Sequence, residues 1–269
     1  MSKKITVLLW SVYGCAFAVY WLQLGGANTV LIRNLIYLCM PLLASIGGIF
    51  ALISFGFHGF RAKTILFITM GLGCWFIGEV SFFYYEFILK TNPFPSIADF
   101  FYLMGYPLMF FALVNEILHT KISLKKIHPS IIFLFCLAIL AFVFLVFYFG
   151  VYLAYDPKEP VLPNLIATWY GIGDLFLIIG NIYILILAWE FRGGSFSHFW
   201  ILFFLSFILM LIADILFAIF TQQYNKEVWF YKSLLDSFWM ASYIFSANAL
   251  FDLGMSLRSA KSQLKKIKQ

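Results

Sequence analysis

The chain has 269 residues, of which 63% are hydrophobic, 21% aromatic and only 11% charged. Soluble domains are roughly half apolar and about a quarter charged, so this composition excludes an ordinary soluble domain and predicts a polytopic membrane protein embedded in a lipid bilayer. The net charge of +6 does not indicate a nucleic-acid partner, because the basic residues lie between apolar runs instead of clustering on one face.

Eight apolar runs follow one another along the chain, each near the ~20 residues that a helix needs to cross a bilayer. They cover residues 5–23, 30–55, 65–90, 97–118, 128–153, 163–189, 197–221 and 230–253. The connections are short, and the sequence has no CxxC or Cys/His spacing. It therefore predicts an all-α bundle of eight transmembrane helices with no metal and no cofactor.

The distribution of Lys and Arg predicts the orientation. Most of the 18 basic residues lie at the N-terminus, after every second run and in the tail. Because positive residues stay on the cytoplasmic side, both termini are expected to be cytoplasmic in a multi-pass cell-membrane protein. The segment "NPFPS", residues 92–96, is then on the outer side.

The two halves of the chain resemble each other. "WFIGEVSFFYYE" (75–86) aligns with "MLIADILFAIFT" (210–221), and "ADFFYLMGYP" (98–107) aligns with "LDSFWMASYI" (235–244). The aligned pairs are Glu79 with Asp214, Asp99 with Asp236, Tyr102 with Trp239, Tyr106 with Tyr243 and, more weakly, Tyr37 with Tyr170. The chain is thus predicted to be a tandem repeat of two four-helix units, residues 1–126 and 127–254, followed by a basic amphipathic tail, residues 255–269. An even number of helices per unit predicts a pseudo-two-fold axis along the membrane normal.

Acidic residues inside apolar runs are the most informative feature. A carboxylate at the centre of a membrane helix costs about 2.5–3.5 kcal/mol on insertion scales, so such groups usually face the bundle interior. We expect no Lys or Arg at a comparable depth to neutralise them. The acids must then share protons, bind a cation, line water or accept hydrogen bonds from Tyr and Trp.

These considerations predict a ligand-binding cavity in the outer half of the membrane, between the two repeats. Its charges would come from Glu79, Asp99, Asp174, Asp214 and Asp236. Its rings and hydroxyls would come from Tyr102, Tyr106, Tyr170, Trp239 and Tyr243. A purely structural interpretation stays open: Asp99 and Asp236 as helix caps or interhelical hydrogen-bond partners, and the aromatic residues as an interfacial belt.

The motifs "PFPSIADFFYLMGYPL" (93–108), "ADILFA" (213–218) and "LLDSFWMASY" (234–243) resemble the eight-helix N-terminal membrane sensor modules of bacterial and archaeal signalling proteins. Those modules precede PAS, GGDEF diguanylate cyclase or histidine kinase domains. The resemblance implies sensing of an outer or intramembrane stimulus and transmission to a cytoplasmic domain or partner. In the tail, Leu257, Ala260, Leu264 and Ile267 form an apolar stripe, either the start of a signalling helix or a basic helix lying on anionic lipid.

Two other functions remain open. The acids of "GEVSFF" and "ADILFA" are also similar to those of lysoplasmalogenase-like membrane hydrolases, in which intramembrane acids would activate water. Tandem repeats with buried acids also suit a proton- or cation-coupled transporter. The sequence favours a non-enzymatic sensor that binds a small cation or amine, with no catalytic residue assigned. The four histidines, His58, His119, His128 and His198, are interpreted as interfacial.

Overall fold

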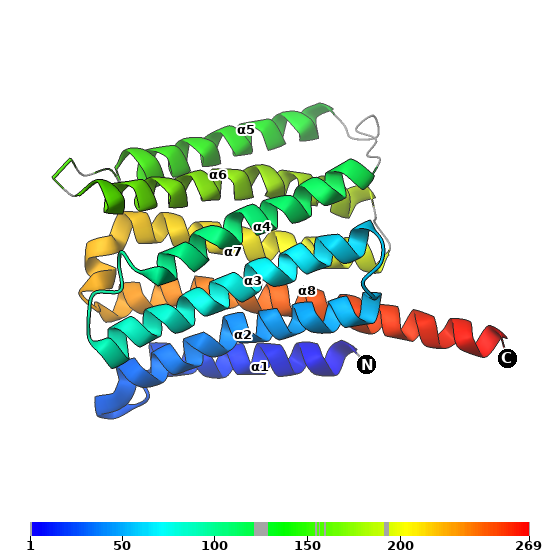
Figure 1. The fold of residues 1–269 in the computed structure, drawn as a ribbon, viewed down its shortest axis with the longest axis horizontal. Coiled ribbons are helices and arrows are strands. Elements are labelled where there is room, and N and C mark those ends of the chain that lie inside the picture. Colours follow the sequence, from blue (N-terminus) through cyan, green and yellow to red (C-terminus); the bar gives the residue numbers. More distant parts are fainter. Residues whose placement is uncertain are drawn as a thin grey trace.

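The protein is a bundle of α-helices in a computed structural model that describes residues 2–120, 129–153, 155, 157, 158, 160–190 and 194–268 (Figure 1). The helices are α1 (Ser2–Trp21), α2 (Thr29–Phe55), α3 (Phe60–Phe83), α4 (Ile97–His119), α5 (Pro129–Val146), α6 (Val161–Glu190), α7 (Ser195–Asn225) and α8 (Trp229–Lys268). The described residues contain no strand. Each helix coincides with one predicted apolar run, so the all-α prediction is confirmed. The predicted boundary between the repeats, at residues 126 and 127, lies outside the described residues.

The helices lie side by side with their long axes nearly aligned, and both chain ends lie at the same end of the bundle (Figure 1). Within the described ranges, six helical segments are long and apolar enough to cross a membrane. They are Lys3–Trp21, Thr29–Phe55, Phe60–Leu89, Ile97–His119, Val161–Trp189 and Phe196–Asn225. The apolar helix Cys136–Tyr152 is shorter.

Helix α8 has the lowest mean hydropathy of the helices, because its exposed end from Arg258 to Ile267 is basic and its packed part carries polar residues. It packs against α1, α2 and α7. Its buried residues include Ser233, Ser246 and Asn248. The Ser246 hydroxyl lies 2.7 Å from that of Ser206 on α7, and Asn248 accepts a hydrogen bond of 2.9 Å from Thr6 on α1. A helix enclosed in this way needs no lipid-compatible surface and can carry polar groups that tie it to its neighbours.

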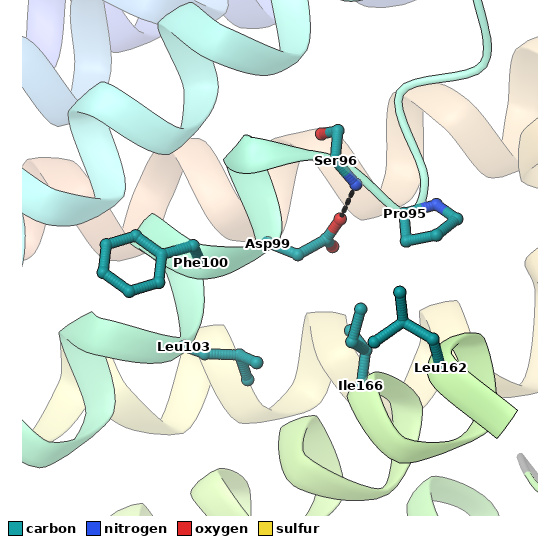
Figure 2. Close-up of a pocket in the computed structure, with 7 residues that line it drawn as sticks. All are labelled: Pro95, Ser96, Asp99, Phe100, Leu103, Leu162 and Ile166. Carbon is teal, nitrogen blue, oxygen red and sulfur yellow. Dashed lines mark hydrogen bonds between the residues drawn. The ribbon is translucent and has the colours of Figure 1, made fainter.

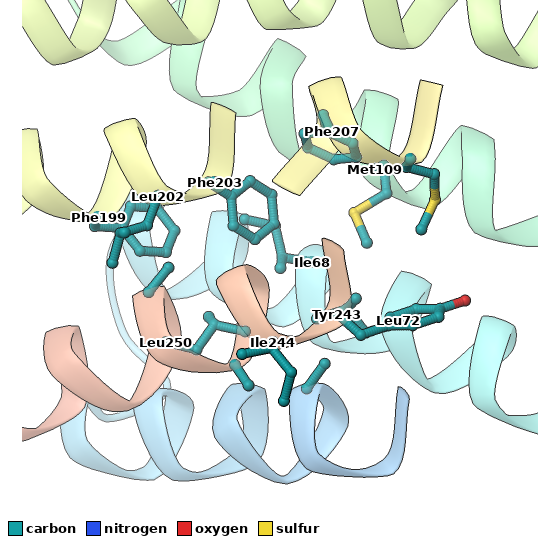
Figure 3. Close-up of a cluster of buried hydrophobic side chains, with 14 of the residues drawn as sticks. Ile68, Leu72, Met109, Phe199, Leu202, Phe203, Phe207, Tyr243, Ile244 and Leu250 are labelled. Atoms are coloured by element: carbon teal, nitrogen blue, oxygen red, sulfur yellow. The ribbon is translucent and has the colours of Figure 1, made fainter. Parts of the chain in front are cut away.

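A large cluster of buried apolar side chains joins α3, α4, α7 and α8 (Figure 3). It includes Ile68, Leu72, Met109, Phe199, Phe203, Phe207, Ile244 and Leu250. Because lipid tails are as apolar as these side chains, a helix bundle in a bilayer is held by close packing instead of exclusion of water. The dense aromatic face of α7 provides this packing surface against α8.

Helices α3 and α7 both depart from α-helical geometry shortly after an acidic residue, Glu79 in α3 and Asp214 in α7. Residues 84–89, directly after α3, form a π-helical turn. Helix α7 is interrupted at Phe220, where φ is −111° and ψ is 23°. Inserted residues of this kind bend a helix and free backbone groups, and they occur often at functional sites. In the sequence alignment of the two halves, Phe220 corresponds to Tyr85 of the π-helical turn.

A close approach between α3 and α4 depends on glycine. The Trp75 indole crosses directly over Gly105, where an added Cβ would collide with the ring. This approach lets the Trp75 Nε1–H donate a hydrogen bond of 3.1 Å to the carbonyl of Tyr102. Gly105 is thus required by the position of the tryptophan.

Replacing Gly105 by Val is expected to displace Trp75 and break its hydrogen bond to α4. Overpacking of this kind costs about 1–3 kcal/mol, which should lower the melting temperature of the purified protein in detergent. Gly73→Ala is the matched control on α3, because nothing lies within 4 Å of a Cβ there. Equal melting temperatures for the two variants would contradict the assignment.

Candidate functional site

The N-terminus of α4 is built around Ser96 and Asp99. Ser96 is the N-cap, and its hydroxyl accepts a hydrogen bond of 3.1 Å from the backbone N–H of Ala98. In return, the Ser96 N–H donates a bond of 2.7 Å to Asp99 Oδ2 (Figure 2). This capping box satisfies helix-terminal donors and holds the carboxylate in place. This oxygen of Asp99 therefore has the capping role that the structural interpretation describes.

The other oxygen of Asp99 connects α4 to α6. The Tyr170 hydroxyl donates a hydrogen bond of 2.9 Å to Asp99 Oδ1. One turn further along α6, Asp174 accepts a bond of 3.0 Å from Tyr106 of α4. Two tyrosine–aspartate bonds in opposite directions thus fasten these helices together, and both aspartates are buried.

The acids of the third helices also face aromatic donors. Asp214 on α7 accepts a bond of 2.8 Å from the Trp239 indole N–H of α8. Glu79 on α3 lies within hydrogen-bonding reach of the hydroxyls of Tyr102 and Tyr37. Asp214 is also close enough to Asp174 for the two carboxyls to interact electrostatically. Trp239 and Tyr102 occupy aligned positions in the two halves.

Five aromatic rings form a continuous row across the bundle, which we call the aromatic row: Tyr37, Tyr243, Trp75, Tyr106 and Tyr170. Successive ring centroids are 6.4, 6.4, 6.1 and 6.4 Å apart, and the planes are steeply inclined to one another. Edge-to-face pairs at these distances are the favoured aromatic geometry. The row passes through α2, α8, α3, α4 and α6 and therefore joins both predicted repeats.

Asp236 lies in a second polar group near the start of α8. It is 2% exposed and accepts a bond of 2.8 Å from the Tyr224 hydroxyl. The Lys232 ammonium, one helical turn earlier, is 3.9 Å from the centroid of the Tyr224 ring and 3.2 Å from Glu227 Oε1. Arg33 of α2 completes the group with a bond of 2.9 Å to Glu227 Oε2.

This arrangement corrects one prediction. No basic residue was expected among the buried acids, yet Arg33 and Lys232 are each only 5% exposed. The Lys232 ammonium lies on the ring of Tyr224, whose hydroxyl bonds Asp236. Both cations lie a few residues inside the apolar runs 30–55 and 230–253. They reach inward because Glu227, which has a left-handed φ of 54°, places its carboxylate between them.

The ten predicted site residues thus fall into connected groups. Asp99, Asp174, Tyr106 and Tyr170 meet between α4 and α6, while Asp214 and Trp239 meet between α7 and α8. Glu79 lies next to Tyr102 and is close enough to Asp236 for electrostatic interaction. Tyr243 belongs to the aromatic row, where its ring lies between those of Tyr37 and Trp75.

Sequence reasoning missed several members of these groups. They are Arg33, Tyr224, Glu227 and Lys232, with Tyr37 and Trp75 noted in the sequence but not assigned to the site. A lysine one turn before an aspartate on the same helix was the available signal for Lys232. The others are brought in by tertiary packing alone.

In the part of the chain that the structure describes, no three His, Cys, Asp or Glu side chains are grouped so that they could hold a metal ion. His119 Nδ1 lies 2.8 Å from the carbonyl of Asn115, and His198 Nε2 lies 3.4 Å from Asp252 Oδ2. His128 lies outside the described residues. Carboxyl groups beside tyrosine and tryptophan donors can exchange protons, accept hydrogen bonds and attract cations.

Comparison of the chain with protein-family models, curated proteins and solved structures finds no match.

Lys232→Met is expected to destabilise the protein, because it removes the buried ammonium that bonds Glu227 and lies on the Tyr224 ring, although Arg33 still bonds Glu227. A hydrogen bond to a charged group contributes about 1.5–3 kcal/mol, and the partial exposure of Glu227 lowers the expected loss to about 1–2 kcal/mol. Thermal unfolding in detergent would measure the loss. Lys226→Met is the control, since Lys226 is exposed in the preceding loop and surface substitutions usually change stability by about 0.5 kcal/mol or less. A small effect at Lys232 would contradict the ion network.

Proposed function

We propose that the chain is a multi-pass cell-membrane protein with eight transmembrane helices and cytoplasmic termini. Six helices have the length and hydropathy that a span requires. Helix α5 continues through the π-helical turn 147–152, and its outer face carries exposed Phe133, Leu134 and Leu140, which suits contact with lipid. Helix α8 is enclosed by its neighbours, and its basic exposed end and buried polar residues account for its lower hydropathy. The position of both chain ends at one end of the bundle agrees with this topology (Figure 1).

The tandem repeat is the second part of the proposal. Tyr37 packs edge-to-face on Tyr243, and Tyr170 packs in the same manner on Tyr106, each pair at 6.4 Å. The alignment equates Tyr37 with Tyr170 and Tyr243 with Tyr106. The second contact therefore repeats the first, with each residue replaced by its counterpart from the other half. The packing of α2 on α8 and of α4 on α6, and the aligned irregularities of α3 and α7, support the same pseudo-two-fold relationship.

The proposed role is that of a sensory or ligand-binding module. The observation that carries it is the aromatic row, which is flanked by the acids Glu79, Asp174 and Asp214 at the junction of the two halves. These acids have aromatic donors but no ion-pair partner among the described contacts. A small cation or amine is the ligand class that combines attraction to carboxylates with attraction to ring faces.

Helix α8 is the proposed path of the signal. It carries Asp236, Trp239 and Tyr243 at the site and continues without interruption to Lys268, a length of about 60 Å, or roughly twice the hydrocarbon thickness of a bilayer. Beyond Leu257 its residues are exposed, and the helix leaves the bundle along its own axis (Figure 1). This direction favours contact with a cytoplasmic domain or partner over a helix lying flat on lipid.

The topology makes a direct prediction. A single Cys introduced at Asn92 in a variant without the native cysteines should react with a membrane-impermeant maleimide on intact cells, whereas one at Ser262 should react only after permeabilisation. The two positions lie at opposite ends of the bundle, and both are exposed. Labelling of both from the same side would contradict the arrangement.

Ligand binding can be tested with tetramethylammonium, a cation suited to aromatic faces. It should raise the melting temperature of the purified protein above that in sodium chloride of equal ionic strength. The Glu79→Gln/Asp214→Asn double variant should bind it about tenfold more weakly, because hydrogen bonds and charges at the site are lost. Asp252→Asn, which changes an acid on α8 near His198, should leave binding unchanged.

The same protein separates this proposal from the alternatives. Uptake of tetramethylammonium into proteoliposomes along its concentration gradient would indicate a carrier instead of a sensor, provided that the uptake requires Glu79 and Asp214. Release of aldehyde from lysoplasmalogen with the same dependence would replace it with a hydrolase. Absence of any stabilisation by tetramethylammonium would contradict the cation site.

A further inference from the structure

A pocket of about 350 Å³ opens beside the start of α4 (Figure 2). Helix α4 and the residue before its cap provide Pro95, Ser96, Asp99, Phe100 and Leu103, and α6 provides Leu162 and Ile166. The walls are almost entirely apolar, and Asp99 is the single charged residue among them. Its carboxylate points toward the space between Pro95 and the two α6 side chains (Figure 2).

The alignment of the two halves places a contrasting set of residues at the equivalent positions between α2 and α8. The offset of the fourth helices equates Pro95 with Lys232 and Asp99 with Asp236, and the offset of α6 and α2 equates Ile166 with Arg33. The two cations of the second crevice are thus replaced by a proline and an isoleucine in the first. The aspartate is present in both.

Positively charged side chains therefore lie between α2 and α8, whereas none is among the described residues that line the pocket between α4 and α6. Between α2 and α8, Lys232 and Arg33 are buried, Lys232 bonds Glu227 and lies over the Tyr224 ring, and the Tyr224 hydroxyl bonds Asp236. In the α4–α6 crevice, Asp99 is also buried, at 5% exposure, but its two hydrogen-bond donors, the Ser96 N–H and the Tyr170 hydroxyl, are neutral. An ionised carboxylate has about four acceptor positions, so two remain for a further donor.

We infer that the α4–α6 pocket binds a primary amine bearing an apolar group, with its ammonium at Asp99 and its apolar group against Leu162, Ile166 and Leu103. The bound amine would bring a positive charge to the position that the alignment equates with Lys232, which carries the charge between α2 and α8. The inference rests on the proposed repeat and extends the proposed function by naming the ligand class and a second binding position, apart from the aromatic row.

Phenylethylammonium is a suitable probe, and 2-phenylethanol is its neutral counterpart of similar size. Calorimetric titration of the full chain in detergent is expected to show the amine binding at least about tenfold more tightly than the alcohol, because the alcohol lacks the charge that Asp99 attracts. Asp99→Asn should reduce amine binding by a similar factor and leave binding of the alcohol unchanged.

Ile166→Arg copies the cation of the other half into the pocket and should abolish amine binding. Ile166→Met is the matched control of similar volume and should bind normally. Pro95→Lys provides a second route to the same result if the arginine variant does not fold, which its melting temperature would reveal. Equal affinity for amine and alcohol would show an apolar groove for lipid and would overturn the inference, as would full binding to a folded Ile166→Arg or Pro95→Lys protein.

Tetramethylammonium distinguishes failure of this inference from failure of the proposed function. A folded Ile166→Arg protein should still be stabilised by tetramethylammonium through Glu79 and Asp214. If tetramethylammonium binds and phenylethylammonium does not, only the α4–α6 pocket is excluded. If phenylethylammonium binds as described and tetramethylammonium does not, the result supports the α4–α6 pocket and contradicts the cation site at the aromatic row.

Discussion

The cost of placing carboxyl groups away from water governs the interior of this protein. An unpaired buried charge is so unfavourable that every such group must find donors or a counterion. Here the donors are tyrosine hydroxyls and a tryptophan indole, at 2.8–3.0 Å from Asp99, Asp174, Asp214 and Asp236. Each of these bonds joins two helices or the two ends of one loop. The acids are thus the points at which the bundle is fastened as well as the candidate points of recognition.

The two halves meet the same requirement in different ways. Between α2 and α8 the protein supplies its own cations, and Glu227 completes an ion network with Arg33 and Lys232. Between α4 and α6 it supplies a capping box and a tyrosine, and apolar residues occupy the positions of the cations. Under the proposed repeat, the protein's own charges occupy one of two related positions, and the pocket beside Asp99 occupies the other.

Much of the fold could be read from the sequence, because apolar runs of the length of a bilayer leave few alternatives. The run 230–253 was recognised as a span although it also carries buried serines such as Ser233 and Ser246. The acids and aromatic residues were expected to share one cavity, but the pairing of individual partners was not predicted, because it depends on which helix faces which. Arg33 and Lys232 lie inside apolar runs, and position along a run does not reveal the direction in which a long side chain extends.

The enclosed position of α8 has a consequence for biosynthesis. The ribosome delivers this helix after α1, α2 and α7, yet those three helices form the walls around it. The earlier helices must therefore leave the translocation machinery as a partly assembled groove, exposing Phe199, Phe203 and Met40 until the last helix arrives. Quality-control proteases that survey the membrane would encounter that groove in any chain whose synthesis stops before α8.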